Sequence, residues 1–191
     1  MSAPYDIAAA QRPHEGESVC GDAYAVSPCA GGTFVALADG LGHGPEAAEA
    51  ARLFCDHVRG AREPSPAQVM RGAHQLLQRT RGVAAGLLYL DPLHGRLAYA
   101  SVGNIELTAV SHEPMRPVGA PGIVGKHLRR ITPYQYRTRG GDVVMLFSDG
   151  ISSHCELAPY LHLGAQEIAD TILARHGKLH DDATCVVVRC R

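Results

Sequence analysis

The chain has 191 residues, of which 46% are hydrophobic, and a formal net charge of −1. This length and hydrophobic fraction suit one compact domain, which we expect residues 1–191 to form. The charges are balanced, with 18 Lys and Arg against 19 Asp and Glu, so nothing indicates binding to nucleic acid or to a membrane surface. No apolar run approaches the roughly 20 residues that span a bilayer.

The first residues of the chain and its cysteines indicate in which cellular compartment we expect the protein. Met1–Ala10 lacks the basic segment followed by an apolar one that is typical of a signal peptide. The six cysteines form no Cys-x-x-Cys pair, and several lie within apolar runs. We therefore expect reduced, mostly buried thiols in a cytoplasmic protein, and we expect a monomer.

Two helices are predicted in the first half of the chain, between strands. The first begins at Pro45, which suits a first helical turn, and continues through the Ala-rich residues 47–58. The second spans Pro66 to about Thr80, with Ser65 as its N-cap. A third helix is expected near the end of the chain, over residues 165–174, ending near Gly177.

The remaining pattern predicts strands, because short apolar or alternating runs are bounded by Gly, Pro, Asp or Asn. In chain order these runs are Ala23–Val26, Thr33–Ala38, Val83–Leu90, Arg96–Ala100, Ile105–Val110, Val143–Phe147 and Cys185–Val188. Residues 91–95 form a predicted hairpin turn. Strands with hairpin-length connections, several of them apolar at every position, indicate an α+β fold: a four-layer α-β-β-α sandwich of two mainly antiparallel sheets flanked by helices.

Aspartates recur where predicted strands begin or end. Asp39-Gly40 and Asp149-Gly150 each follow a buried-strand run, Asp181-Asp182 precedes the last strand, and Asp22 precedes the first. A single Asp-Gly pair is more often a turn than a ligand. Several carboxylates at one rim, however, repel one another unless cations neutralise them. Mg²⁺ and Mn²⁺ prefer such oxygen ligands, and two of these ions can activate water and clamp a phosphoryl oxygen.

These motifs together resemble a known family. Gly21-Asp22, Ala38–Gly44, Ser148–Gly150 and Asp181–Thr184, in this order, are similar to the pattern of the metal-dependent type 2C (PPM) protein phosphatases, and most closely to their bacterial sporulation-type branch. The similarity covers almost the whole chain. In its short length, the chain further resembles the small stand-alone serine phosphatases of the bacterial stressosome.

The resemblance implies a site with two Mn²⁺ or Mg²⁺ ions. By motif position, Asp39 would bridge both ions and the carbonyl of Gly40 would face one of them. Asp149 and Asp181 would hold the second ion, and Asp22 would serve the first through water. The implied reaction is attack of a metal-bound water on phosphoserine or phosphothreonine of sulfate-transporter/anti-sigma-antagonist (STAS) domain proteins that act in stress signal transduction.

The sequence departs from this pattern at Leu41, where many eukaryotic relatives have a histidine that is a candidate general acid. We expect His43, two residues further along, to take that catalytic role, with a metal-bound water as the alternative. His180 could orient Asp181 or lie in an exposed turn, and His154 is interpreted as a solvated loop residue. Two other functions stay open: a non-catalytic partner-binding module, and a metal-dependent hydrolase of a small phosphorylated metabolite.

Overall fold

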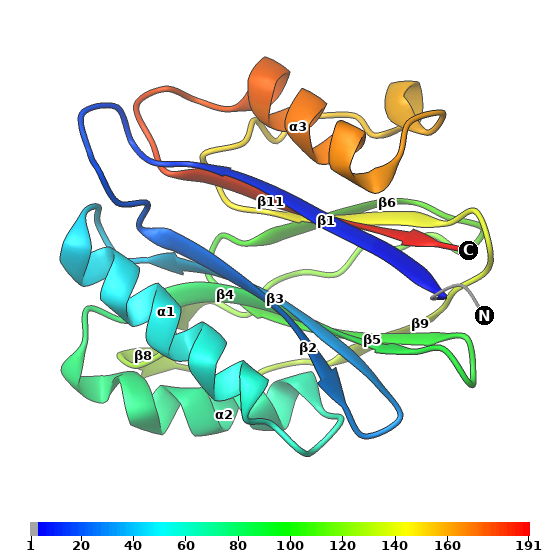
Figure 1. Ribbon diagram of the computed structural model, residues 1–191. Helices are drawn as coiled ribbons and strands as arrows, with labels where there is room; N and C mark the ends of the chain where they lie inside the picture. Colours follow the sequence, from blue (N-terminus) through cyan, green and yellow to red (C-terminus); the bar gives the residue numbers. More distant parts are fainter. Residues whose placement is uncertain (1–3) are drawn as a thin grey trace.

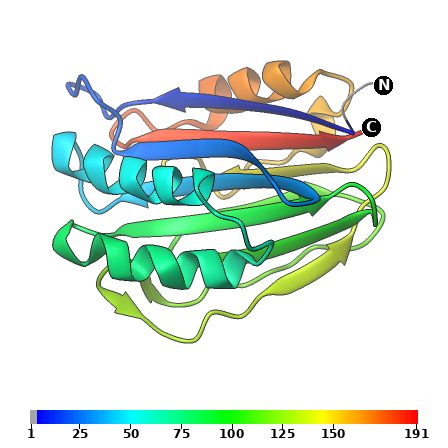
Figure 2. The same cartoon turned by 60° about the horizontal axis from the view of Figure 1, so that its bottom comes forward.

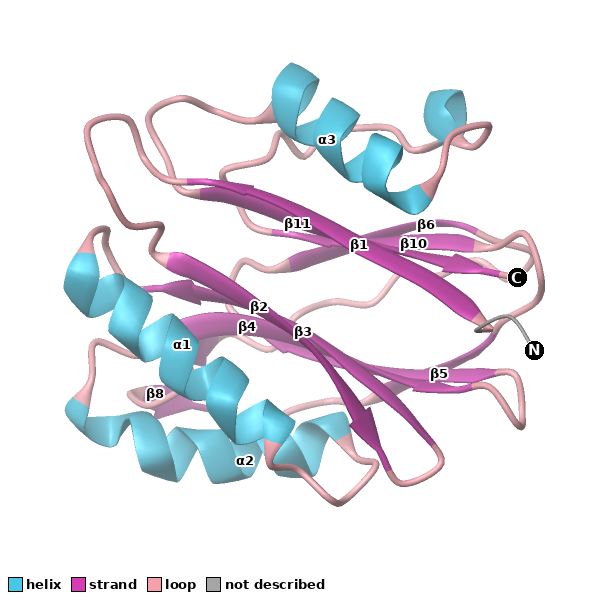
Figure 3. Ribbon diagram, viewed as in Figure 1, coloured by secondary structure: helices cyan, strands magenta, loops and turns pink. Residues whose placement is uncertain are grey.

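The computed structural model describes residues 4–191, so the first three residues of Met1–Ala10 lie outside the described part. Two antiparallel sheets pack face to face, and helices cover both outer faces (Figures 1 and 3). The predicted four-layer α-β-β-α sandwich is therefore confirmed. No helix among residues 4–191 is long and apolar enough to cross a membrane.

The first sheet has four strands in the order β1-β11-β10-β6, all antiparallel to their neighbours. Their bounds are Tyr5–Arg12 (β1), Ala183–Cys190 (β11), Val143–Phe147 (β10) and Glu106–Val110 (β6). Helix α3, Ala165–His176, covers the outer face of this sheet (Figure 1).

The second sheet has five antiparallel strands in the order β2-β3-β4-β5-β9. They are Asp22–Cys29 (β2), Gly32–Gly40 (β3), Val83–Asp91 (β4), Arg96–Val102 (β5) and Tyr134–Arg137 (β9). Helices α1, Pro45–Arg59, and α2, Pro66–Leu76, lie side by side over its outer face (Figure 2). A short hairpin of β7, Gly122–Ile123, and β8, His127–Leu128, forms a small third sheet beside β4, where Val124 of the hairpin pairs with Val83.

The strands carry apolar side chains on both faces because both faces are covered. In β3, Val35 and Leu37 pack into the space between the sheets, whereas Phe34 and Ala36 pack towards the helices. The same alternation holds in β10 and β11. This double burial explains the continuous apolar runs, and it fixes the register that brings the strand ends together.

Several element boundaries differ from the sequence expectation. Strands β1, β7, β8 and β9 were not expected, and α2 ends at Leu76, where a 3-10 turn, Leu77–Arg79, completes the segment. Ser65 is the N-cap residue of α2, but its side chain makes no capping hydrogen bond. All six cysteines are free thiols, and four of them are buried.

Candidate active site

The aspartates singled out in the sequence converge at one end of the sandwich. Asp22 opens β2 and lies opposite Asp39, near the end of β3, in the antiparallel ladder. Asp149 follows β10, and Asp181 precedes the neighbouring strand β11. Strands β2 and β3 are neighbours in one sheet, and β10 and β11 are neighbours in the other. Each sheet therefore contributes two of these carboxylates to the same rim, at the end of the sandwich where α1 begins (Figure 1).

A cavity of about 360 Å³ opens at this rim. Three of the aspartates line it, together with Asn104 and a group of histidines. The lining residues are His14, Asp39, Leu41, Gly42, His43, Ala84, Asn104, Asp149, His180 and Asp181. Among residues 4–191, no phenylalanine, tyrosine or tryptophan lines it, so no such ring is placed to stack against a nucleobase.

Asp22 lies deeper than the cavity lining, with only 3% of its surface exposed. Its Oδ2 accepts a hydrogen bond of 2.7 Å from the Ser148 hydroxyl group, while its buried Oδ1 has no partner among the described residues. Burial raises the pKa of Asp22 to about 7, and the charges of Asp182 and Asp149 add to this increase. A buried carboxylate oxygen without a donor is costly, which makes Oδ1 available to a cation or to its water.

Asp39 is a partly buried acid that lies among other acids. Burial raises its pKa to about 8, and the charges of Asp22, Asp149, Asp181 and Asp182 all contribute in the same direction. Burial, and then the charge of Asp149, likewise raise the pKa of Asp181. Burial first, and then repulsion between these carboxylates, disfavour their ionised forms, which a bound cation would favour.

The donor set suits a hard divalent cation that keeps some of its water. Within residues 4–191, no three His, Cys, Asp or Glu side chains stand close enough to enclose an ion by themselves. Mg²⁺ is commonly bound through one or two carboxylates and retains several waters. Carboxylates with uncompensated charge and the unpartnered Oδ1 of Asp22 fit such an ion.

The glycine of each Asp-Gly pair is required by close packing. A Cβ on Gly40 would overlap the carbonyl oxygen of Ala47, in the first turns of α1, and a Cβ on Gly150 would overlap the carbonyl oxygen of Asp182. The Gly40 amide also donates to the carbonyl of Gly21 over 3.1 Å. Asp39-Gly40 ends strand β3, whereas Asp149-Gly150 forms a turn closed by the Ile151 amide and the Ser148 carbonyl over 2.9 Å. Both glycines stand where the backbone of another segment approaches closely.

Asn104 and Lys178 hold Asp149 in place. Nδ2 of Asn104 donates to Oδ2 of Asp149 over 2.7 Å, and Nζ of Lys178 donates to the Asp149 carbonyl over 2.5 Å. No local sequence pattern could indicate this pairing, because 45 residues separate Asn104 from Asp149.

His43 lies at the cavity with a carboxylate partner that the sequence analysis missed. Nδ1 of His43 is 2.7 Å from Oε1 of Glu17, and its ring stacks on that of His14, with centroids 5.1 Å apart. The backbone amide of His14 donates to Oδ1 of Asp182 over 2.9 Å, which fixes the loop that carries Glu17. Of the other histidines considered, His180 lines the cavity, whereas His154 is exposed and does not.

Comparison with known proteins places this arrangement in a class. The family model for stage II sporulation protein E (SpoIIE) matches residues 30–191. Phosphoserine phosphatase RsbX of Bacillus subtilis (strain 168) is 24% identical over 177 residues, which cover 91% of this chain and 88% of RsbX. A structure from work on the bacterial stressosome, as a modular system adapted to control secondary messenger signaling, is 32% identical, with a TM-score of 0.91. It covers 97% of this chain and 99% of that one.

Two more structures share the fold. RsbX in complex with magnesium has a TM-score of 0.86 at 22% identity, covering 98% of this chain and 96% of RsbX. The catalytic domain of the serine/threonine protein phosphatase PstP, in complex with two manganese ions, has a TM-score of 0.73 at 18% identity, covering 97% of both chains. The fold is thus that of the metal-dependent protein serine/threonine phosphatases of the PP2C class. The chain belongs to the SpoIIE family, as the resemblance of its motifs implied.

Proposed function

We propose that this protein serine/threonine phosphatase hydrolyses phosphoserine or phosphothreonine on STAS-domain proteins of a stress-signalling pathway, with two Mn²⁺ or Mg²⁺ ions. The observation that carries the catalytic part is the group of carboxylates with raised pKa values around an open cavity. The substrate class is supported by similarity to a phosphoserine phosphatase, RsbX, and to a protein of the bacterial stressosome.

We assign the metal-holding residues from their placement. Asp39 would contact both ions, and the Gly40 carbonyl would face one of them. The charges of four other aspartates raise the pKa of Asp39, which supports its place among them. Asp149 and Asp181 would hold the second ion. Asp22 would act on the first through water, which its depth below the cavity and its unpartnered Oδ1 favour. Bound ions of this kind supply positive charge to the phosphoryl group and lower the pKa of coordinated water.

The protein's own groups orient the substrate. Glu17 fixes His43 through Nδ1, so that Nε2 is left to donate to a phosphate oxygen or to the departing serine oxygen. The side chain of His43 is 61% exposed, so a bound substrate can reach it. Leu41 lines the cavity without a polar group, which leaves His43 as the residue of this loop that can donate a proton.

Phosphate release from a phosphoserine STAS-domain protein tests this function. The wild type should release phosphate with Mn²⁺ but not with EDTA, and Asp39→Asn should abolish the release. Asp56→Asn is a matched control, because Asp56 is an exposed acid of α1 that pairs with Arg52 and Arg59. Release from free phosphometabolites but from no phosphoprotein would indicate a small-molecule hydrolase instead, and metal binding without any turnover would indicate a binding module.

A further inference from the structure

Two segments that are distant in the sequence bring cations to one side of the molecule. Residues 64–90 and 114–141 contain nine of the chain's 18 Lys and Arg and none of its 19 Asp and Glu. Five of these cations surround α2, the 3-10 turn after it and the β7–β8 hairpin. We call these five the basic face: Arg71, Arg79, Lys126, Arg129 and Arg130.

The charges of the basic face are available to a partner. All five side chains are exposed, and none forms an ion pair with any residue in the range 4–191. Only Lys126 has a side-chain hydrogen bond there, to the carbonyl oxygen of Gln78. Unpaired cations gathered on one surface create a local positive potential there, although the net charge of the whole chain is only −1.

The basic face is hollowed instead of flat. One hollow of about 320 Å³ is lined by Arg71, Arg129 and Arg130, and a second of about 700 Å³ by Arg79 and Lys126. His74 lines the first hollow and Leu76 lines the second. These residues are two positions apart on α2, so the two hollows are neighbours. Leu76 is 52% exposed, so the face also offers apolar surface, which a folded protein can cover.

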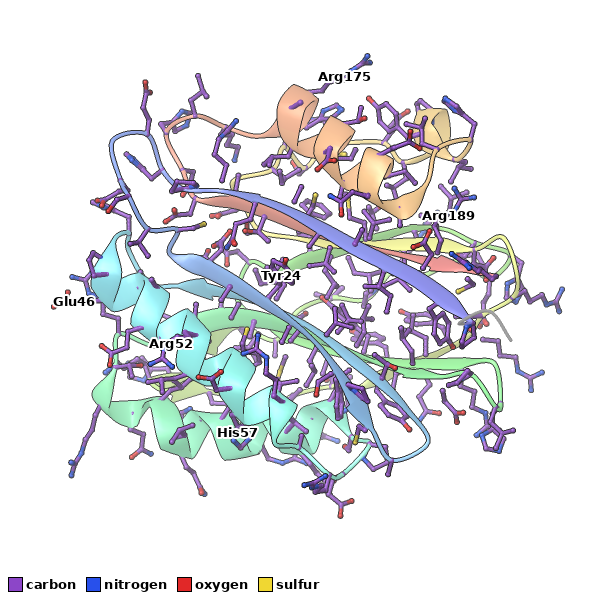
Figure 4. All side chains as sticks on the ribbon, in the orientation of Figure 1. Tyr24, Glu46, Arg52, His57, Arg175 and Arg189 are labelled. Atoms are coloured by element: carbon purple, nitrogen blue, oxygen red, sulfur yellow. The ribbon has the colours of Figure 1, made fainter. Side chains whose placement is uncertain are left out.

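Arg81 connects this face to the catalytic cavity. It lines the larger hollow, and its Nη1 lies 2.8 Å from the position that a Cβ of Gly42 would take, while Gly42 lines the cavity. Two acids also line the larger hollow: Glu46, at the start of α1, pairs with Arg81, and Glu49 forms no ion pair with the described residues. The three cations of this hollow, Arg79, Arg81 and Lys126, still outnumber its two acids. Figure 4 shows Glu46 at the end of the molecule where β3 ends and α1 begins.

We propose that the basic face is a docking surface for an acidic segment of the phosphorylated protein substrate, next to its phosphoserine. This inference rests on the proposed phosphatase function and names the charge of the substrate that the same site accepts. Because Arg81 lines both the larger hollow and the surroundings of Gly42, the basic face lies next to the cavity and can hold an acidic segment while its phosphoserine enters the cavity. Complementary charge at such a rim acts mainly on association and on the choice of partner.

Two phosphopeptides that differ only in flanking charge provide the test. Both carry the same phosphoserine, one with Asp and Glu around it and one with Asn and Gln in their place. p-Nitrophenyl phosphate serves as a substrate too small to reach the face. The full chain carries either Arg79→Glu/Arg129→Glu/Arg130→Glu or the control Arg62→Glu/Arg137→Glu/Arg175→Glu, whose sites are exposed and lie outside the face, Arg175 on the opposite helix layer (Figure 4).

For the acidic peptide, the basic-face variant should lose about tenfold or more in kcat/KM, through KM, while the control variant retains the wild-type value. The neutral peptide and p-nitrophenyl phosphate should be unaffected by either variant. Raising the ionic strength should weaken the wild type on the acidic peptide and leave the basic-face variant almost unchanged.

Three outcomes would overturn the proposal. Equal losses on both peptides, equal losses in both variants, or stronger competition by a DNA duplex than by the unphosphorylated acidic peptide would each exclude an acidic protein segment as the occupant. If instead the wild type cleaves none of the substrates with Mn²⁺, the proposed phosphatase function fails. If it cleaves both peptides equally well, only the docking proposal fails.

Discussion

The hydroxyl group of Ser148 donates a hydrogen bond to Oδ2 of Asp22 over 2.7 Å, and so joins the end of one sheet to the start of the other. Ser148 is completely buried, and its Oγ also accepts from the amide of Thr184 over 3.0 Å. One side chain therefore bridges β2, β10 and β11 directly beneath the cavity. The orientation of Asp22, and with it the direction of its free Oδ1, depends on this bridge.

Replacement of Ser148 should destabilise the protein. In Ser148→Ala, both the Thr184 amide and Oδ2 of Asp22 lose a buried partner, which should lower the free energy of unfolding by about 1–3 kcal/mol. Chemical denaturation measures this change. Ser153→Ala is the control, because Ser153 is exposed in the loop that follows, and it should stay within about 0.5 kcal/mol of wild type. Similar values for both variants would contradict a structural role of the bridge.

The stability of the metal-free protein should fall as the pH rises. Burial is the main cause that raises the pKa of Asp22 to about 7 and the pKa of Asp39 to about 8. In the unfolded chain both groups have the ordinary aspartate pKa of 3.8. Between these values the folded state binds more protons than the unfolded state, so the free energy of unfolding decreases from about pH 4 to about pH 8.

Thermal melting in EDTA across this range measures the slope. Asp39→Asn should make the slope shallower, because it removes one of the two groups, and Asp56→Asn should leave it unchanged. Mn²⁺ at pH 8 should raise the melting temperature of the wild type, since a bound cation stabilises the ionised carboxylates. A flat wild-type profile in EDTA would show that the acids are not held apart from solvent as the structure indicates.

Asn104 should contribute to metal affinity without contacting the metal. It is the only asparagine in the sequence, and its Nδ2 holds Oδ2 of Asp149 at 2.7 Å. Residues that orient a ligand typically change metal affinity by about 10–100-fold when they are removed. Calorimetric titration of Asn104→Ala with Mn²⁺ should show such a loss, while Gln135→Ala, an exposed amide on β9, should not. An unchanged affinity would remove Asp149 from the proposed ligand set or Asn104 from its support.

Glu17 should act through His43, as a positioning residue. His43→Ala should lower kcat about 100-fold if His43 donates a proton, and Glu17→Ala should lower it less, because the imidazole remains but loses its orientation. The double variant should be no slower than His43→Ala, since the two residues form one unit. Glu17→Gln should recover part of the loss, because its amide oxygen can still accept from Nδ1.

Glu15→Ala is the matched control for this series, because Glu15 lies exposed in the same loop. Strictly multiplicative effects of Glu17→Ala and His43→Ala on kcat would indicate that the two residues act separately. In that case the contact between them would be a feature of the loop and not of catalysis.

The parts of this molecule that the sequence predicted are those with local causes. Apolar runs predicted the central strands because both faces of each sheet are covered, and the Asp-Gly breaks marked where these strands end. Strand β1 was missed because most of its residues are only half-buried along the edge of its sheet, so it lacks a clear alternation. Strand β9 is four residues long, too short for its period to stand out from a loop.

The missed part of the candidate site depends on folding over a distance. Glu17 reaches His43 only because the β1–β2 loop folds back, tied by the bond from the His14 amide to Asp182. Arg129 and Arg130 are close to Arg137 in the sequence, but the structure places Arg137 at the end of β9, opposite Arg96. The partners of Arg129 and Arg130 on the basic face come from α2 and its following turn, which no local pattern could indicate.

The glycine after Asp39 provides a test of close packing at the site. Because a Cβ there would overlap the backbone of Ala47, Gly40→Ala must push α1 away from β3, and we expect a loss of about 3 kcal/mol or more in the free energy of unfolding. Gly60 is the matched control: it ends the same helix with φ −84°, and a Cβ there would find its nearest neighbour at 3.6 Å. Gly60→Ala should therefore be neutral or stabilise by about 0.4–1 kcal/mol, through the unfolded chain. Urea denaturation of both variants measures the difference, and equal stabilities would mean that α1 can shift without cost, so that the position of Asp39 does not depend on its neighbour.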